Sequence, residues 1–174
     1  MIVANFCHPG LDLGNPVIYS GRIAKEPHMN IRQVEKVPQK ITHGHCLCGA
    51  AQWTIHGEIL DATICNCTAC RRSGALWAYD YEGHGIHVTA PENGLTAYVR
   101  GSGSLSFNFC RVCGNLVFWR GLNLDEDGRT RIAVNLRLAD EPGDVANVPL
   151  QRFEGLHSFE DLPRDGRQVA HVWF

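Results

Sequence analysis

The chain contains two short cysteine turns, Cys46-Leu47-Cys48-Gly49 and Cys110-Arg111-Val112-Cys113-Gly114, and their pairing decides the fold. Such turns direct two sulfurs at one ion, and zinc prefers four ligands in a tetrahedron, with thiolate sulfurs at about 2.3 Å. Each turn flanks a predicted strand, so one ion would join strand ends that lie far apart in the sequence. We expect Gly114 to adopt the left-handed backbone that a tight turn often needs. The sequence predicts one closed structural zinc site that contributes directly to the folding free energy. Its ligands are Cys46, Cys48, Cys110 and Cys113.

A third cluster, Cys65-Asn66-Cys67-Thr68-Ala69-Cys70, carries three cysteines in one short loop, and no fourth cysteine is near it in the sequence. Three protein ligands with one exchangeable position are typical of a catalytic or ligand-binding zinc site. A charge of +2 from zinc and −3 from three thiolates leaves −1, which the adjacent Arg71 and Arg72 could offset. We therefore predict a second zinc ion, held by Cys65, Cys67 and Cys70, with one coordination position open.

Other interpretations of the cysteines stay open. A side chain from elsewhere could fill the fourth position of the second site and make it structural. Cys-x-x-Cys pairs also occur as redox motifs, although these favour a βαβ context, and thiolates also hold iron–sulfur clusters. Eight cysteines could form disulfides in a secreted protein. The candidate fourth ligands are His43, His45, His56, His84, His87 and the Cys7-His8 pair.

The composition indicates a globular domain. The chain has 174 residues and a formal net charge of −2, without a long Lys/Arg run, which argues against nucleic acid as a partner. No apolar stretch is long enough to span a bilayer. Residues 1–16 lack a basic start followed by a sustained apolar run, so we expect no secretory signal and a cytoplasmic location.

The pattern of residues 44–174 predicts an all-β domain. Short stretches rich in Val, Ile, Thr and aromatic residues alternate with Gly, Asn and Asp turns, which favours a sandwich- or barrel-like sheet assembly with very little helix. We expect single helical turns at 68–73 and 158–163. Residues 1–43 contain four prolines and little periodicity, and we interpret them as an N-terminal arm. The predicted strands are 51–56, 76–81, 86–89, 95–99, 105–109, 115–119, 131–138 and 169–174.

Three runs of the sequence together resemble the glutathione-dependent formaldehyde-activating enzyme (GFA) family, which includes the centromere protein V group. The runs are 44–49, 65–75 and 109–114, and the resemblance covers roughly residues 44–140. It implies a zinc-stapled β-tent fold, the same division of the seven cysteines between two zinc ions, and glutathione bound through its thiol at the second ion. Two departures are visible: Asn66 stands where the family often has His, and residues 150–159 replace the family's usual C-terminal stretch.

The resemblance implies a carbon–sulfur lyase or synthase that acts on a glutathione–aldehyde adduct of the S-hydroxymethylglutathione type. Glutathione carries two carboxylates, for which arginines are suitable partners. We expect Arg71 and Arg72 to bind it, with Arg100 and Arg111 as further candidates, and Trp77 to wall the pocket. Tyr79 and Trp119 could add to that wall. The alternatives are a thiol-binding module without catalysis and an interaction domain with two structural zinc ions. We expect no nucleic-acid or membrane partner, and exposed sheet edges are compatible with a homodimer.

Overall fold

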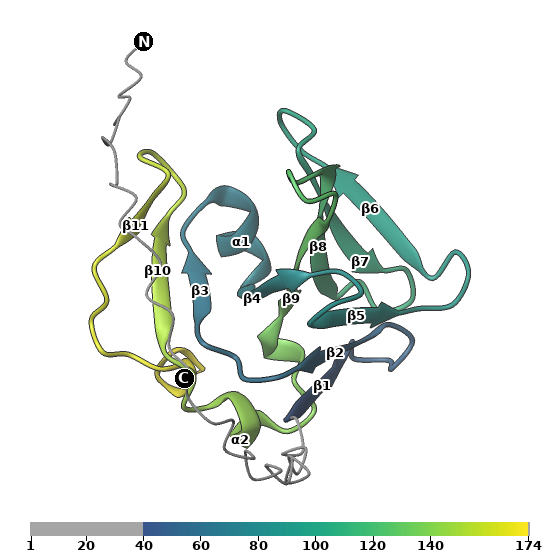
Figure 1. The fold of residues 1–174 in the computed structure, drawn as a ribbon. Coiled ribbons are helices and arrows are strands. Elements are labelled where there is room, and N and C mark those ends of the chain that lie inside the picture. Colours follow the sequence, from purple (N-terminus) through teal and green to yellow (C-terminus); the bar gives the residue numbers. More distant parts are fainter. Residues whose placement is uncertain (1–39, 174) are drawn as a thin grey trace, which may run out of the picture. The chain divides into compact units, whose positions relative to one another are not determined.

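The computed structural model describes residues 40–173, and in that range β-strands form two sheets (Figure 1). The chain divides into two units, Met1–Glu35 and Lys36–Phe174, and the first lies outside the described residues. Most of the predicted arm 1–43, with Cys7 and His8, therefore also lies outside them. The first described strand begins at Ile41, three residues before the boundary that we placed at the cysteine motif.

The smaller sheet has three antiparallel strands in the order β1-β2-β5. The larger sheet has eight strands in the order β11-β10-β3-β4-β9-β8-β7-β6, and β10 runs parallel to β3, whereas the other neighbours are antiparallel. Their bounds are β1 Ile41–His45, β2 Gln52–His56, β3 Ala62–Cys65, β4 Leu76–Tyr81, β5 Ile86–Thr89, β6 Leu95–Val99, β7 Leu105–Cys110, β8 Leu116–Leu124, β9 Thr130–Asn135, β10 Leu150–Glu154 and β11 Glu160–Leu162.

Helix is scarce in the described residues. The α-helices are α1 (Thr68–Ser73) and α2 (Pro142–Val145), and the 3-10 turns are η1 (Leu136–Leu138) and η2 (Val169–Val172). None of these helices has the length and apolar character needed to cross a membrane. The predicted all-β class with little helix is confirmed.

Two predicted elements are wrong. Residues 169–172 form a 3-10 turn, because Val169 and Val172 repeat at the three-residue period of that helix and His171 Nδ1 accepts the amide of Gln168 at 2.9 Å. Residues 158–163 do not form a helical turn: Phe159 has a φ of 58°, and β11 then pairs with β10. The predicted strand 131–138 ends early because Asn135 Oδ1 accepts the amide of Arg137 at 3.2 Å and begins η1.

The large sheet buries apolar side chains on both faces near its centre. In β4, Leu76 and Ala78 belong to a core cluster that also contains Trp53, Phe118 and other buried side chains. Trp77 lies between them in sequence and joins a separate cluster with Phe107 and Cys70. Because successive side chains of a strand point to opposite faces, β4 separates the main core from a second apolar face. That second face carries the candidate site.

Gly44 in β1 tests the packing of the small sheet. A Cβ at this buried position would overlap the Trp53 ring and lie 2.5 Å from the carbonyl oxygen of Leu138. We expect Gly44→Ala to destabilise the fold by roughly 1–3 kcal/mol, the usual cost of overpacking, measured by chemical denaturation. Gly143→Ala is the control, because a Cβ there meets nothing within 4 Å. Equal stability of both variants would contradict this account.

Candidate functional site

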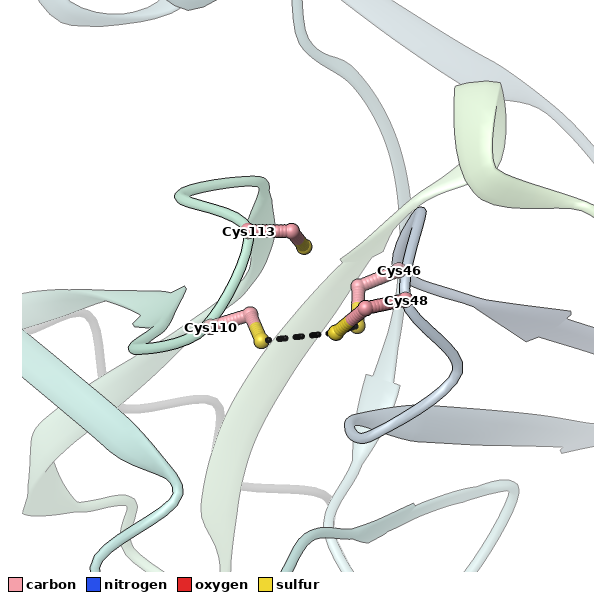
Figure 2. A group of neighbouring side chains, drawn as sticks. All are labelled: Cys46, Cys48, Cys110 and Cys113. Carbon is pink, nitrogen blue, oxygen red and sulfur yellow. Dashed lines mark hydrogen bonds between the residues drawn. The ribbon is translucent and has the colours of Figure 1, made fainter.

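Four cysteines from two distant turns converge on one point. Cys46 and Cys48 follow β1, Cys110 ends β7, and Cys113 lies between β7 and β8 (Figure 2). All four sulfurs lie within 4.8 Å of one another, with 3.5 Å between Cys46 and Cys48 and 3.6 Å between Cys48 and Cys110. A tetrahedral ion with sulfurs at about 2.3 Å has sulfur–sulfur edges of about 3.8 Å. The four side chains therefore fit one metal ion.

The two turns have the same backbone. The amide of Gly49 donates to the carbonyl of Cys46 at 2.7 Å, and that of Gly114 donates to the carbonyl of Cys110 at 2.9 Å. Both glycines have a φ of 76°, as expected for Gly114. The amide of Ala51 also donates to Cys46 Sγ at 3.3 Å, a bond that favours the thiolate form.

Asn115 connects the two turns directly. Its Oδ1 accepts the amide of Leu47 at 2.7 Å, across the boundary between the two sheets. Its backbone hydrogen bond also lowers the pKa of Cys113 to about 6. The same residue thus aligns the turns and favours the ionised form of a metal ligand.

The three remaining described cysteines gather where β3 ends and α1 begins. Cys65 is the last residue of β3, Cys67 is the N-cap of α1, and Cys70 lies within that helix. Their sulfurs lie within 4.8 Å of one another, so this group also fits a metal ion. No disulfide joins any of the seven cysteines in the described part of the chain.

Each sulfur of this second cluster accepts one N–H donor. The amide of Cys67 donates to Cys65 Sγ at 3.4 Å, and the amide of Cys70 donates to Cys67 Sγ at 3.5 Å. The indole N–H of Trp77 donates to the buried Cys70 Sγ at 3.2 Å. The hydrogen bond between Cys70 and Cys65 lowers the pKa of Cys65 to about 6 and raises that of Cys70. Donors on every sulfur suit a thiolate cluster around a cation.

Within residues 40–173, no fourth Cys, His, Asp or Glu completes the second cluster. Three of the candidate histidines are engaged elsewhere: His45 pairs with Asp140, and His56 packs against His87 at 5.1 Å between ring centroids. His43 and His84 are likewise outside the cluster. Cys7 and His8 lie outside the described residues.

The second cluster opens into a cleft of about 830 Å³. Trp77, Tyr79 and Trp119, expected from the sequence as pocket walls, all line it. Burial raises the pKa of Tyr79 to about 12. The phenol therefore stays protonated at neutral pH.

The arginines of the cleft differ from those expected. Arg71 and Arg72 are exposed in the last turn of α1, and neither is among the lining residues. Arg100 lines the cleft, as do Arg131 and Arg164, which the sequence analysis missed. Arg164 is paired with Asp61 at 2.7 Å, whereas Arg131 lies 5.3 Å from the centroid of the Tyr79 ring.

The β10–β11 hairpin packs on the cysteine loop. A Cβ at Gly155 would lie 2.6 Å from Cys65 Sγ, so only glycine permits this approach. Asn66 donates to Glu154 Oε1 at 2.8 Å and accepts the amide of Gly155 at 2.8 Å. The Asn66 side chain and backbone donors at His157 and Ser158 lower the pKa of Glu154 to about 2.

The hairpin residues were also missed from the sequence. Asn66 and residues 150–159 could have indicated this hairpin, because both differ from the family's usual sequence. In the structure they contact each other.

The chain is similar to a protein family and to a solved structure. A family model described as glutathione-dependent formaldehyde-activating enzyme matches residues 41–152. A crystal structure of a Rhodobacter sphaeroides protein is similar, with 29% sequence identity over 62% of this chain and 98% of that chain, and a TM-score of 0.47. No curated protein matched. The family match includes both cysteine clusters, and the chain belongs to the glutathione-dependent formaldehyde-activating enzyme family.

Proposed function

We propose that this protein is a zinc-dependent carbon–sulfur lyase or synthase that acts on glutathione–aldehyde adducts in the cytoplasm. The observation that carries the proposal is the three-cysteine cluster at the floor of an open cleft, in a chain of this family. The four-cysteine cluster would hold a second, structural zinc ion. Sheet edges at β6 and β11 leave a homodimer open.

Zinc on Cys65, Cys67 and Cys70 would hold a thiol sulfur in its thiolate form at the fourth coordination position. The chain's own residues would then prepare the rest of the reaction. The Trp77 N–H fixes the orientation of the Cys70 sulfur. Tyr79 lines the cleft, and its protonated hydroxyl would be suited to donate a hydrogen bond to the aldehyde-derived oxygen.

Arg100 and Arg131 are the best partners for the carboxylates of glutathione. Both line the cleft, and within the described residues neither is paired with a carboxylate, whereas Arg164 already binds Asp61. Arg71 and Arg72, proposed from the sequence, do not line this cleft and are better suited to balancing the charge of the nearby cluster.

The two cysteine clusters should respond differently to mutation. Cys110→Ser breaks the site that joins two sheets, so we expect severe destabilisation or no folded protein. Cys67→Ser removes a ligand at one loop, so we expect a folded domain that has lost one of two zinc ions. Metal content by mass spectrometry and thermal unfolding by circular dichroism measure both. Equal collapse of the two variants would favour an interaction domain with two structural zinc ions.

The reaction can be tested with glutathione and formaldehyde. We expect zinc-loaded protein to accelerate adduct formation or breakdown beyond the rate in buffer with glutathione alone, followed by NMR exchange. Arg131→Gln should raise KM for glutathione roughly tenfold to hundredfold, because a charge-assisted hydrogen bond is lost. Arg137→Gln is the control, because it makes the same charge change at an exposed arginine that does not line the cleft. If the unaltered protein does not accelerate the reaction, the proposed activity is wrong.

A further inference from the structure

We propose that the aldehyde-derived group at this site is apolar and larger than hydroxymethyl, and that Phe159 and Phe153 form the wall that selects it. The inference rests on the proposed function, because it concerns what is attached to the glutathione sulfur. The expected substrates are adducts of glutathione with aryl or alkyl aldehydes, which the site would bind in preference to the formaldehyde adduct.

The first observation is the aromatic lining around the three-cysteine cluster. The rings occur in pairs: Trp77 with Phe107 at 6.4 Å, Tyr79 with Trp119 at 5.7 Å, and Phe153 with Phe159 at 6.3 Å between centroids. All six side chains line the same cleft. A hydroxymethyl group is small and polar and would bury little apolar surface against these rings. An aryl or alkyl group would bury more, and each square ångström of buried apolar surface makes the free energy of binding more favourable.

The second observation is the strained backbone of Phe159. Its φ of 58° places a bulky L-residue in the left-handed region, which costs of the order of 1 kcal/mol or more. Asn93 is the other non-glycine residue with positive φ in the described chain, and Asn tolerates that conformation. The Phe159 side chain is 68% exposed, so burial in the core does not offset the strain. A ligand that covers the ring would account for both features.

The third observation is that the loop carrying Phe159 is held on the cysteine loop. Glu154 accepts the amides of His157 at 2.8 Å and Ser158 at 2.7 Å, and it also accepts a hydrogen bond from Asn66. The approach of Gly155 to Cys65 fixes the base of the same hairpin. The position of Phe159 relative to the three-cysteine cluster is therefore defined.

The family match ends at residue 152, immediately before this wall. The cysteines belong to the matched region, whereas Phe153 and Phe159 do not. The metal-binding part thus lies within the residues that match the family model, whereas the wall lies outside them. A difference in the wall would alter the preferred substrate and leave the metal chemistry unchanged.

The chemistry remains balanced for the larger substrate. In the forward direction the thiol adds across the aldehyde C=O: an S–C bond forms, the π bond breaks, and the thiol proton ends on the oxygen. The reverse reaction releases thiol and aldehyde, and neither direction needs an oxidant or reductant. The wall contacts only the carbon substituent, so it selects among aldehydes without changing the step.

Two stable glutathione thioethers test the inference. S-benzylglutathione has the carbon skeleton of the benzaldehyde adduct, and S-methylglutathione has that of the formaldehyde adduct. By calorimetry on the zinc-loaded full chain, we expect the benzyl compound to bind roughly tenfold to hundredfold more tightly. Phe159→Ala should bring the ratio of the two affinities towards one. Tyr98→Ala is the control, because Tyr98 is an exposed aromatic residue that does not line the cleft, and it should leave the ratio unchanged.

Phe159→Gly separates a ligand-binding role from a structural one. Glycine relieves the strain at positive φ, so the variant should lose the benzyl preference while its Tm rises by a few degrees. A fall in Tm would mean that the ring serves the fold, and the inference would be wrong. Equal affinities in the unaltered protein would also overturn it. If the protein accelerates the reaction of glutathione with formaldehyde but shows no preference for the benzyl compound, only this inference fails. If no glutathione compound binds, the proposed function fails as well.

Discussion

The convergence of four thiols between two turns is the constraint on which the rest of the structure depends. Cys46 and Cys110 are buried, and no backbone ladder joins the three-stranded sheet to the eight-stranded sheet within residues 40–173, apart from isolated bridges such as Gly44 with Ala139. A structural zinc ion in a small domain supplies about 10–16 kcal/mol. That is as large as the entire net stability of a typical domain, about 5–15 kcal/mol. One ion at this junction would therefore reinforce the apolar core that the two sheets share, in which Trp53 of β2 and Phe118 of β8 both lie.

The three-cysteine cluster does not join the two sheets, but its position is set by the large sheet. It lies on the opposite face of the large sheet, and β4 connects the two faces through the alternation of its side chains. Leu76 and Ala78 face the core, whereas Trp77 faces the cleft and donates to Cys70. The buried strand β4 thus holds the indole N–H of Trp77 at a fixed distance from Cys70 Sγ. Binding chemistry of this kind needs a preorganised donor more than it needs further contacts.

Much of the fold and of the candidate site was readable from the sequence, where the signal was local. The cysteine spacing grouped all seven described cysteines correctly, and strands such as 76–81 and 95–99 were predicted with their observed bounds. Strands with weak local patterns were not found: β10 and β11 are mixed polar segments whose pairing with β3 and with each other is decided by tertiary contacts. The glutathione contacts of Arg71 and Arg72 stay a prediction, although neither residue lines the cleft. Arg131 lines it from β9, a position that sequence adjacency to the cysteines could not indicate.

The two cysteine clusters differ in what surrounds their sulfurs, and this difference links the fold to the chemistry. In the four-cysteine cluster, both turns are closed by backbone hydrogen bonds and left-handed glycines, so all four positions of a tetrahedron are supplied by rigid elements. In the three-cysteine cluster, the sulfurs come from one short loop and line the cleft, and the β10–β11 hairpin packs against that loop. That hairpin is tied down by Asn66 and Glu154 and approaches through Gly155. Asn66 and the hairpin are the positions at which the chain departs from its family resemblance, and they contact each other directly. Because the Asn66 side chain bonds to Glu154 and to Gly155, the two departures form one structural feature beside the three-cysteine cluster.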